Sequence, residues 1–498
     1  MRYYSTRNQG NYTSSAEAIK QGLAPDGGLY VPSSRAVPFK TDNLPAGSYN
    51  EIAAAVFKLF LTDFDSADLE KAIAAAYNEA NFAHPSITPL RKLSADLFMM
   101  ELWHGPTCAF KDIALQILPH LLNTAVRITG EQSEIVILTA TSGDTGKSAL
   151  EGFSNVPNTK IIVYFPAGGV SEVQQLQMTT QEGRNVGVAA VHGNFDDTQN
   201  GVKEIFNDRR LTGQLAEAGY RLSSANSINW GRLLPQIVYY FAAYHDLVSS
   251  GDLRPGDMIN FVVPTGNFGN ILAGYYAREL GLPVNRLICA ANSNNVLSDF
   301  INTGIYQSRR PLHRTCSPSM DILVSSNLER LLFELTDHQA GVITGWMEQL
   351  MKNGEYKLDK GTLTKLQDLF WADYADDRET LQTIADNYRE FDYLIDTHTA
   401  VARAVLRKYR AREEDGCLSV ILSTANPFKF SGSVIRALYD SEMYRGVSEL
   451  DLLNILSLKT NNPVPPGLAA LAGKPVKHKQ VIERHNMRDH LLSTLELI

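Results

Sequence analysis

Short, continuous apolar runs alternate with helical patterns along the chain from residue 134 onward. Continuous apolar strands are typical of a parallel sheet that is covered by helices on both faces. The alternation therefore predicts an α/β fold. The predicted strands span residues 134–141, 159–166, 186–193, 258–266, 286–292 and 417–424.

The candidate helices between these strands have recognisable ends. Ser171 is placed to cap the helix that follows it, and the helical run from residue 267 stops at Gly281, with Pro283 two residues later. A polar cap at the start, and glycine and then proline at the end, are common helix boundaries.

Two segments are less regular than the rest. The first hundred residues carry helical patterns at 49–62 and 66–80 and no strong sheet signal, which is typical of an N-terminal appendage. Residues 325–390 are mostly helical and charged, which indicates an insertion or an outer layer. The predicted units are an N-terminal region, a smaller α/β domain and a larger α/β domain, at residues 1–98, 99–250 and 251–498.

The composition is that of an ordinary globular protein. Of the 498 residues, 44% are hydrophobic and 20% are charged, as in folded domains in general. The formal net charge of −8 argues against a nucleic-acid or membrane partner and favours a small molecule. Neither a secretory signal nor an apolar run of about 18 residues is evident, so we expect a cytoplasmic protein. The four cysteines lack the spacing of a zinc or redox motif, and we expect no metal site.

The first candidate for chemistry is the turn after the strand at 134–141. Gly146, Lys147 and Ser148 match the end of a nucleotide-binding P-loop, but Thr141 stands where that loop needs its leading glycine. The match to an ATP site is therefore partial. A helix that begins after a small polar turn still favours an anion through its free N–H groups and its dipole. Lys147 would either tune the affinity for a phosphate or face solvent.

Lys111 is the candidate reactive amine. It stands at the beginning of a predicted helix whose apolar face is Ile113, Ile117 and Leu121. A lysine in the first turn opposes the helix dipole, which destabilises its charged form and suits an amine that acts as a nucleophile. An exposed lysine near a helix start is the commoner interpretation of such a segment on its own.

A glycine turn at 264–270 is the candidate phosphate cradle. Gly266 and Gly269 stand between a strand and a helix, and residues without a β-carbon let successive backbone N–H groups converge on one anion. Such a turn is more often a plain connection, but a second anion loop and a candidate reactive lysine in the same chain favour the cradle.

Polar residues in two further segments complete the candidates. Asn226 and Ser227 stand at a helix start, and Arg232 follows within two turns, where it could clamp a phosphate or a carboxylate. A capping pair and a surface arginine are an equally good interpretation. Thr424 ends a strand at the sheet edge where open α/β folds bind ligands. His398 is interpreted as a structural residue at a helix start.

Taken together, these segments resemble the threonine synthases. The matching motifs are PT-x-AFKD at 106–112, TSGDTG at 141–146, GNF-D-D at 193–197, SANSINW at 224–230, PTGNFG at 264–269 and SPSMDI at 317–322, with GLAPDGGLYVP near the start. The resemblance covers essentially the whole chain in order. It implies a fold type II enzyme that uses pyridoxal 5′-phosphate (PLP), with two α/β domains, mostly parallel sheets and an N-terminal appendage.

The resemblance also implies which residues contact the cofactor. Lys111 would bind PLP covalently through its amine and shuttle protons. Asp144 would lie near the ring hydroxyl, and Thr424 would face the pyridine nitrogen with a neutral hydroxyl. The phosphate of PLP would be held by the loop of Gly266, Asn267, Phe268, Gly269 and Asn270.

A second set of residues would bind the substrate. The loop from Thr141 to Thr145, Ser142 included, would hold the substrate carboxylate and part of its phosphate. Asn226, Ser227 and Arg232 would complete the phosphate site.

The activity implied is the conversion of O-phospho-L-homoserine and water into L-threonine and phosphate, and the resemblance favours a monomer. The alternatives are another PLP-dependent lyase such as threonine dehydratase, an ATPase that uses residues 141–148, and a noncatalytic protein that binds PLP or phosphorylated ligands. The sequence departs from the family pattern at Cys108, where Leu is usual, and at Asn426 and Phe428, which replace His and Ala.

Overall fold

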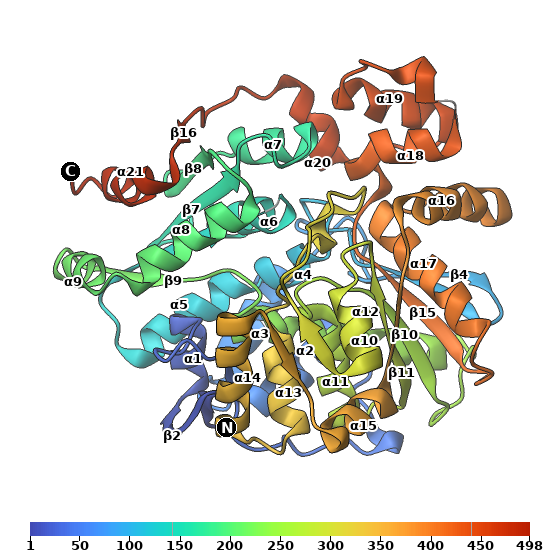
Figure 1. Ribbon diagram of the computed structural model, residues 1–498, viewed down its shortest axis with the longest axis horizontal. Coiled ribbons are helices and arrows are strands. Elements are labelled where there is room, and N and C mark those ends of the chain that lie inside the picture. Colours follow the sequence, from blue (N-terminus) through green and yellow to red (C-terminus); the bar gives the residue numbers. More distant parts are fainter. Residues whose placement is uncertain (142, 440) are drawn as a thin grey trace.

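Two sheets, each covered by helices, make up most of the molecule (Figure 1). The computed structural model describes residues 1–141, 143–439 and 441–498. The larger sheet has the strand order β14-β11-β10-β15-β5-β4 and is parallel except for the β4–β5 pair. Its strands are β4 (Leu90–Ser94), β5 (Leu97–Glu101), β10 (Ile259–Pro264), β11 (Val284–Ala291), β14 (Phe370–Tyr374) and β15 (Leu418–Ser423).

The smaller sheet is parallel throughout, with the strand order β16-β8-β7-β6-β9. Side chains of β6 point alternately to two apolar clusters, with Ile135 and Ile137 in one and Val136 and Leu138 in the other. Both faces are therefore buried, as its continuous apolar strands predict. The strands are β6 (Glu134–Ala140), β7 (Thr159–Pro166), β8 (Val186–Val191), β9 (Tyr220–Ser223) and β16 (Val481–Ile482).

The helices cover both faces of each sheet. Helix α17 packs on the larger sheet opposite α11, and α8 packs on the smaller sheet opposite α6. The helices are α1 (Ser15–Gln21), α2 (Tyr49–Phe60), α3 (Ser66–Ala76), α4 (Lys111–Leu115), α5 (Leu118–Thr129), α6 (Asp144–Phe153), α7 (Glu172–Thr179), α8 (Phe195–Asn207), α9 (Arg209–Glu217), α10 (Trp230–Ser249), α11 (Gly269–Glu279), α12 (Val296–Thr303), α13 (Leu328–Leu335), α14 (Ala340–Asn353), α15 (Lys360–Leu369), α16 (Asp377–Phe391), α17 (Thr397–Arg410), α18 (Ser431–Leu438), α19 (Glu449–Thr460), α20 (Pro466–Ala469) and α21 (Met487–Thr494).

Each of the six predicted strands forms within two residues of its predicted ends. Ser171 caps α7 with Gln174 in a reciprocal capping box, and α11 ends just before Gly281, as predicted. The predicted helix from Lys111 differs, because the structure divides it into α4 and α5 at residues 116 and 117. Ile113, Ile117 and Leu121 are nevertheless all buried.

The N-terminal region contains α2 and α3, as predicted, and also a three-stranded sheet of order β2-β1-β3. Its strands are β1 (Tyr3–Ser5), β2 (Asn8–Thr13) and β3 (Tyr30–Pro32). These strands are short, and β2 reads NQGNYT with almost no apolar residue. Neither feature gives the alternation by which a strand is recognised in sequence. A two-stranded sheet joins β12 (Ile305–Gln307) and β13 (Glu355–Lys357).

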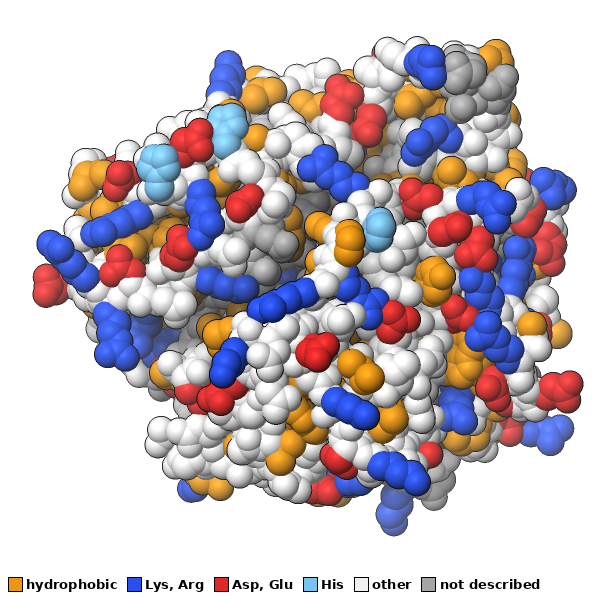
Figure 2. Space-filling view, in the orientation of Figure 1, with side chains coloured by type: hydrophobic (Ala, Val, Ile, Leu, Met, Phe, Trp, Pro, Cys, Tyr) orange, Lys and Arg blue, Asp and Glu red, His pale blue; other side chains and the backbone are white. Residues whose placement is uncertain are grey.

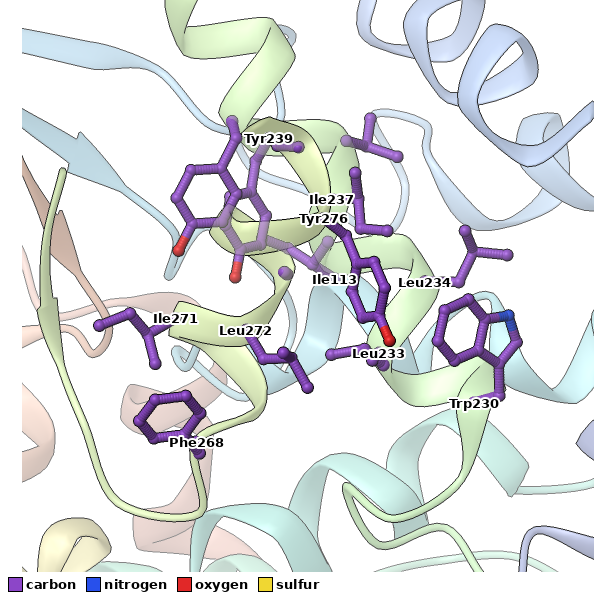
Figure 3. Close-up of a cluster of buried hydrophobic side chains, with 14 of the residues drawn as sticks. Ile113, Trp230, Leu233, Leu234, Ile237, Tyr239, Phe268, Ile271, Leu272 and Tyr276 are labelled. Carbon is purple, nitrogen blue, oxygen red and sulfur yellow. The ribbon is translucent and has the colours of Figure 1, made fainter. Parts of the chain in front are cut away.

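The long helix α10 organises the core between the two sheets. Leu233 and Ile237 of α10 meet Ile113 of α4 and Leu272 of α11 in one buried apolar cluster (Figure 3). Close packing of buried side chains holds helices in fixed relative positions. The starts of α4 and α11, which carry Lys111 and the predicted phosphate loop, are therefore fixed relative to one another.

The chain passes between the sheets more than once. After α19 it continues to β16, which pairs with β8 at the edge of the smaller sheet (Figure 1). The larger sheet likewise takes strands from separate stretches of sequence. The boundaries at 1–98, 99–250 and 251–498 stay a prediction.

Acidic and basic side chains are interspersed over the face of the molecule in Figure 2. Within the described residues, no helix is both long and apolar enough to cross a membrane. The same part of the chain contains no group of three or more His, Cys, Asp or Glu side chains placed to hold a metal ion.

Candidate active site

A pocket opens where β10 and β15 of the larger sheet end and where α4, α6 and α11 begin. It contains about 680 Å³ of empty space, solvent at its mouth included. The residues that line it are Phe110, Lys111, Asp144, Thr145, Ser227, Arg232, Gln236, Pro264, Thr265, Gly266, Asn267, Phe268, Gly269, Asn270, Ser319, Met320, His398, Thr424 and Ala425.

Lys111 is the first residue of α4, and its ammonium reaches into the pocket. The Nζ atom lies 3.3 Å from Oδ2 of Asp144. Burial lowers the pKa of Lys111, and the carboxylate of Asp144 opposes this shift. A destabilised ammonium is what the position at the helix start predicts, and burial is the largest cause of the lowered pKa. A buried lysine whose charged form is destabilised is suited to act as a nucleophile or a base.

Asp144, the first residue of α6, receives four donors from four different segments. Oδ1 is 2.8 Å from Nζ of Lys429 and accepts from Gln174 Nε2 at 3.0 Å. Oδ2 contacts Lys111 and accepts from Ser319 Oγ at 3.0 Å. Burial by itself would raise the pKa of this carboxyl, but the ammonium groups of Lys429 and Lys111 outweigh it and hold the pKa well below its usual range. Asp144 is therefore a fixed negative charge beside the pocket.

The glycine loop at 266–270 lines the pocket. Phe268 has φ +63° and precedes α11, and a left-handed residue next to a helix start turns successive N–H groups toward one point. Asn270 accepts from Tyr239 Oη at 2.6 Å, but its Nδ2 has no hydrogen-bond partner among the described residues. A buried donor without a partner is costly, so the loop is suited to an anionic ligand.

Residues of the 325–390 segment, which the sequence predicted to be an insertion or an outer layer, hold the glycine loop in place. Asn327 is buried, and its Nδ2 donates to Asn267 O at 2.9 Å and to Ser227 Oγ at 3.1 Å. Ser325 Oγ donates to Gly266 O at 2.7 Å. Part of the 325–390 segment therefore shapes the pocket.

Arg232 on α10 is, after the glycine loop, the second group in the pocket that is suited to bind an anion. Its side chain is buried, and Nη1 donates to Ala225 O while Nε has no partner in the described part of the chain. No carboxylate of the described residues lies within ion-pair distance of it. Burial accordingly lowers its pKa to about 10. A buried guanidinium without an ion-pair partner is costly, and Asp112 only partly offsets this burial, so Arg232 is suited to bind an anionic ligand.

Most of the predicted site residues come together in this pocket, but Thr141 and Asn226 do not line it. Thr141 is buried, and its Oγ1 accepts from the N–H groups of Gly143 and Gly146, so it shapes the turn. Asn226 donates to Ala140 O at 3.5 Å, and its Oδ1 has no described partner. Ser142 lies outside the described residues. Their binding of substrate stays a prediction.

Several residues of the site were not predicted as such. Asp144 is contacted by Lys429, Gln174 and Ser319. Of these three, only Ser319 lies in a motif that matches the threonine synthases, SPSMDI. His398 lies near the start of α17, as interpreted, but it also lines the pocket, where its Nε2 accepts from the Ser319 N–H at 3.2 Å. Its Nδ1 faces Asp396 Oδ1 at 2.9 Å.

Lys147 does not face solvent, and an effect of this residue on phosphate affinity stays a prediction. It is buried, does not line the pocket, and pairs with Glu151 Oε2 at 2.7 Å and with Gln181. The i, i+4 spacing of Lys147 and Glu151 is a signal in the sequence from which this structural pair could have been predicted.

Family models match three parts of the chain. Residues 2–77 match the threonine synthase N terminus, residues 83–351 match the pyridoxal-phosphate dependent enzymes, and residues 399–490 match the threonine synthase C-terminal region. The threonine synthase of Pseudomonas aeruginosa is 40% identical over 88% of this chain and 90% of its own length. This chain belongs to the threonine synthase family.

Other members of the threonine synthase family agree with this assignment. Human threonine synthase-like 1 is 40% identical over 91% of this chain, which spans only 61% of that protein's length. The crystal structure of yeast threonine synthase superposes with a TM-score of 0.87 at 32% identity and covers 100% of this chain and 99% of its own. PLP-bound threonine synthase from Brucella melitensis gives 0.84 at 36% identity, over 98% and 99%.

Membership of the threonine synthase family confirms the predicted fold type II architecture and PLP as the cofactor. The residues of the pocket fit this group on their own chemistry. PLP needs an amine to bind its aldehyde and donors for its phosphate, and the pocket combines the Lys111 amine with the N–H groups and the unpartnered Asn270 Nδ2 of the glycine loop.

Proposed function

We propose that the protein converts O-phospho-L-homoserine and water into L-threonine and phosphate. The observation that carries this proposal is that one pocket combines a buried amine with two kinds of anion donor, the glycine loop and the Arg232 guanidinium. The glycine loop would take the phosphate of the cofactor, and Arg232, whose Nε has no described partner, would take the phosphate of the substrate. An enzyme whose substrate carries no phosphate would not need the second kind of donor.

The residues that would hold PLP are Lys111, Asp144, Gly266, Asn267, Phe268, Gly269, Asn270 and Thr424. When bound, PLP supplies an electron sink for charge that develops on the substrate carbons. Thr424 is buried beside the pocket, and its hydroxyl is a neutral partner for a ring nitrogen.

The chain's own residues would then move protons and bind the leaving group. The amine of Lys111 would act as the base for the proton on the substrate α-carbon. Asp144 keeps that amine at a fixed position through the 3.3 Å contact. Arg232 and Ser227 would bind the phosphate as it leaves the γ-carbon, because a guanidinium stabilises developing negative charge.

The substrate contacts predicted from the sequence complete this proposal. Thr141, Ser142 and Thr145 would bind the substrate carboxylate and part of its phosphate, and Asn226 would join Ser227 and Arg232. Thr145 lines the pocket and the Thr141 hydroxyl holds the turn before it. We also propose, from the sequence, a monomer that acts in the cytoplasm, with the domain boundaries given above.

The decisive test is an assay for threonine and phosphate produced from O-phospho-L-homoserine. Equimolar appearance of both products would support the proposal. A PLP-dependent dehydratase would instead release ammonia from threonine. A noncatalytic protein, an alternative kept open because the matched proteins include threonine synthase-like 1 as well as threonine synthases, would bind PLP and release neither product.

An ATPase that uses residues 141–148 is the weakest alternative. The lysine that would contact the nucleotide phosphates, Lys147, is paired with Glu151 and Gln181 and does not line the pocket. Titration of the protein with Mg²⁺-ATP in a calorimeter should therefore give no heat of binding, and saturable micromolar binding would reopen this alternative.

Replacing Gly266 by alanine should weaken PLP binding about tenfold or more. A β-carbon on Gly266 would come 2.9 Å from the backbone oxygen of Ser319, so either the glycine loop or the turn that carries Ser319 must shift. The measurement is the dissociation constant of PLP from its fluorescence change on binding.

Gly269→Ala is the matched control, because a β-carbon there comes no closer than 3.5 Å to another protein atom. The cofactor-free Gly269→Ala protein should keep its melting temperature, whereas Gly266→Ala should lower it. Equal melting temperatures for the two variants would contradict the close approach between residue 266 and Ser319.

A further inference from the structure

Lys429 is a second buried lysine beside the candidate active site, and it does not line the pocket. It lies in a short 3-10 helix, Pro427–Phe430, and its side chain is fully buried. Nζ is 2.8 Å from Asp144 Oδ1 and donates to Thr107 O at 2.9 Å. Burying an ammonium costs several kcal/mol unless it is paired, so these contacts account for its presence.

The contacts of Lys429 join three segments that contact the cofactor site. Thr107 stands four residues before Lys111, Asp144 begins α6 of the smaller sheet, and Lys429 itself follows Thr424 by five residues. Thr107 is itself fixed, because its N–H and its hydroxyl both donate to Asp112, at 2.8 Å and 2.6 Å. One ammonium therefore sets the spacing between the starts of α4 and α6 and the end of β15.

The two lysines share Asp144 unequally. Lys429 holds Oδ1 at 2.8 Å, whereas Lys111 reaches Oδ2 at 3.3 Å and shares that oxygen with Ser319 Oγ. Lys429 thus makes the shorter contact, and the carboxylate is already neutralised before Lys111 contributes. The 3.3 Å contact that remains for Lys111 is within hydrogen-bond range, so it can orient the amine. It is longer than the contact of Lys429, so it binds the amine less tightly.

The electrostatics agree with this geometry. The charged groups that act on Lys111 are Asp144, Lys429 and, from α10, Arg232, and His398 of α17 acts on Asp144. Burial is the largest cause of the lowered pKa of Lys111, and the positive charge of Lys429 adds to it, while Asp144 opposes both.

We propose that Lys429 is a positioning residue for the active-site amine: it neutralises Asp144 through Oδ1, so that Asp144 holds Lys111 in place without keeping it as an ammonium. This inference rests on the role proposed for Lys111. Lys429 would act through Asp144, and not through contact with the substrate or the cofactor.

Removing the charge of Lys429 leaves Lys111 as the nearer cation for Asp144. The ammonium of Lys111 then becomes more stable, and the pH at which its amine loses its proton rises. A like charge within a few ångströms shifts such a midpoint by about one unit or more. Lys429→Gln is the variant of choice, because its amide keeps a donor for Thr107 O while it removes the charge.

The experiment titrates Lys111 itself in the cofactor-free, full-length protein. Each variant is treated with an amine-reactive reagent at a series of pH values, and labelling of the peptide that contains Lys111 is measured by mass spectrometry. Lys429→Gln should raise the labelling midpoint by about one unit, and Lys429→Arg should leave it near that of the unchanged protein. Asp144→Asn, which removes the carboxylate, should lower the midpoint.

The matched control is Lys20→Gln. Lys20 is also buried and paired, with Glu17 at 2.8 Å and Glu131 at 3.4 Å, but it lies outside the pocket. An unchanged midpoint in folded Lys429→Gln, or an equal rise in Lys20→Gln, overturns the proposal. If Lys429→Gln does not fold, a raised midpoint in Lys429→Arg or an unchanged one in Asp144→Asn overturns it equally.

The readout needs neither PLP nor substrate. A protein that fails to make threonine from O-phospho-L-homoserine but shows the shifts in Lys111 would refute the proposed function alone. A protein that makes threonine but shows no shift would refute only the role of Lys429.

Discussion

Replacing Lys111 by alanine should reduce the formation of threonine and phosphate by at least about 1,000-fold, since a positioned proton-transfer group alone contributes 10² to 10⁴. The variant also loses the only amine that lines the pocket among the described residues. The purified, unchanged protein should show an absorbance band of bound PLP, and borohydride should fix the cofactor on Lys111. Lys111→Ala should show no such covalent labelling.

The fold should survive this change. Asp144 keeps the Lys429 ion pair and the hydrogen bonds from Gln174 and Ser319, so its carboxylate is not left unpaired. The melting temperature should stay within a few degrees of that of the unchanged protein. Lys20→Ala is a control for the loss of a buried lysine outside the pocket and should remain active. Turnover by Lys111→Ala within tenfold of the unchanged protein would exclude Lys111 as the reacting amine.

Replacing Arg232 by alanine should raise the KM for O-phospho-L-homoserine by about 30-fold or more, because truncating one partner of a buried charge pair costs at least about 2 kcal/mol. Threonine carries no phosphate, so its affinity should change much less. Steady-state kinetics and a competition assay with threonine measure the two effects. The dissociation constant of PLP should also stay close to its original value, because the glycine loop is the separate site proposed for the cofactor phosphate.

Arg403→Ala is the matched control for the loss of a buried guanidinium. Arg403 is also buried with a pKa lowered to about 10, chiefly by burial, but it lies on α17 outside the pocket and pairs with Glu390 at 3.8 Å. Its loss should leave the KM for the phosphorylated substrate nearly unchanged. If Arg232→Ala weakens O-phospho-L-homoserine and threonine equally, Arg232 does not belong to the phosphate site.

The sequence predicted the parts of the fold that have a strong local pattern. The strands at 134–140 and 259–264 are buried on both faces. Burial on both faces requires a continuous apolar run, which is visible in the sequence. Lys111 and the glycine loop could be found for a similar reason, since helix starts and glycine turns have local signatures. The strands of the N-terminal sheet have no such signature, because they are three to six residues long and are held by pairing with one another.

The candidate site was predictable residue by residue but not as a network. Lys429 stands in the segment STANPFKF with nothing nearby in the sequence to explain a buried charge, because its partners Asp144 and Thr107 are about three hundred residues away. The same holds for Asn327, which supports a loop sixty residues earlier. Contacts of this kind depend on how the two sheets are placed, and single-sequence patterns carry no information on that.

The short strand β16 has a consequence for any attempt to cut the protein into parts. It covers the outer edge of β8, and Met487 and Leu491 of the following α21 lie in the same apolar cluster as Val136 and Leu138 of β6. A recombinant piece that ends before residue 481 would leave β8 with unpaired backbone groups beside uncovered apolar side chains, which is the usual starting point for strand-to-strand aggregation. Such a truncated product should therefore collect in inclusion bodies even though it retains Lys111, Asp144 and the glycine loop.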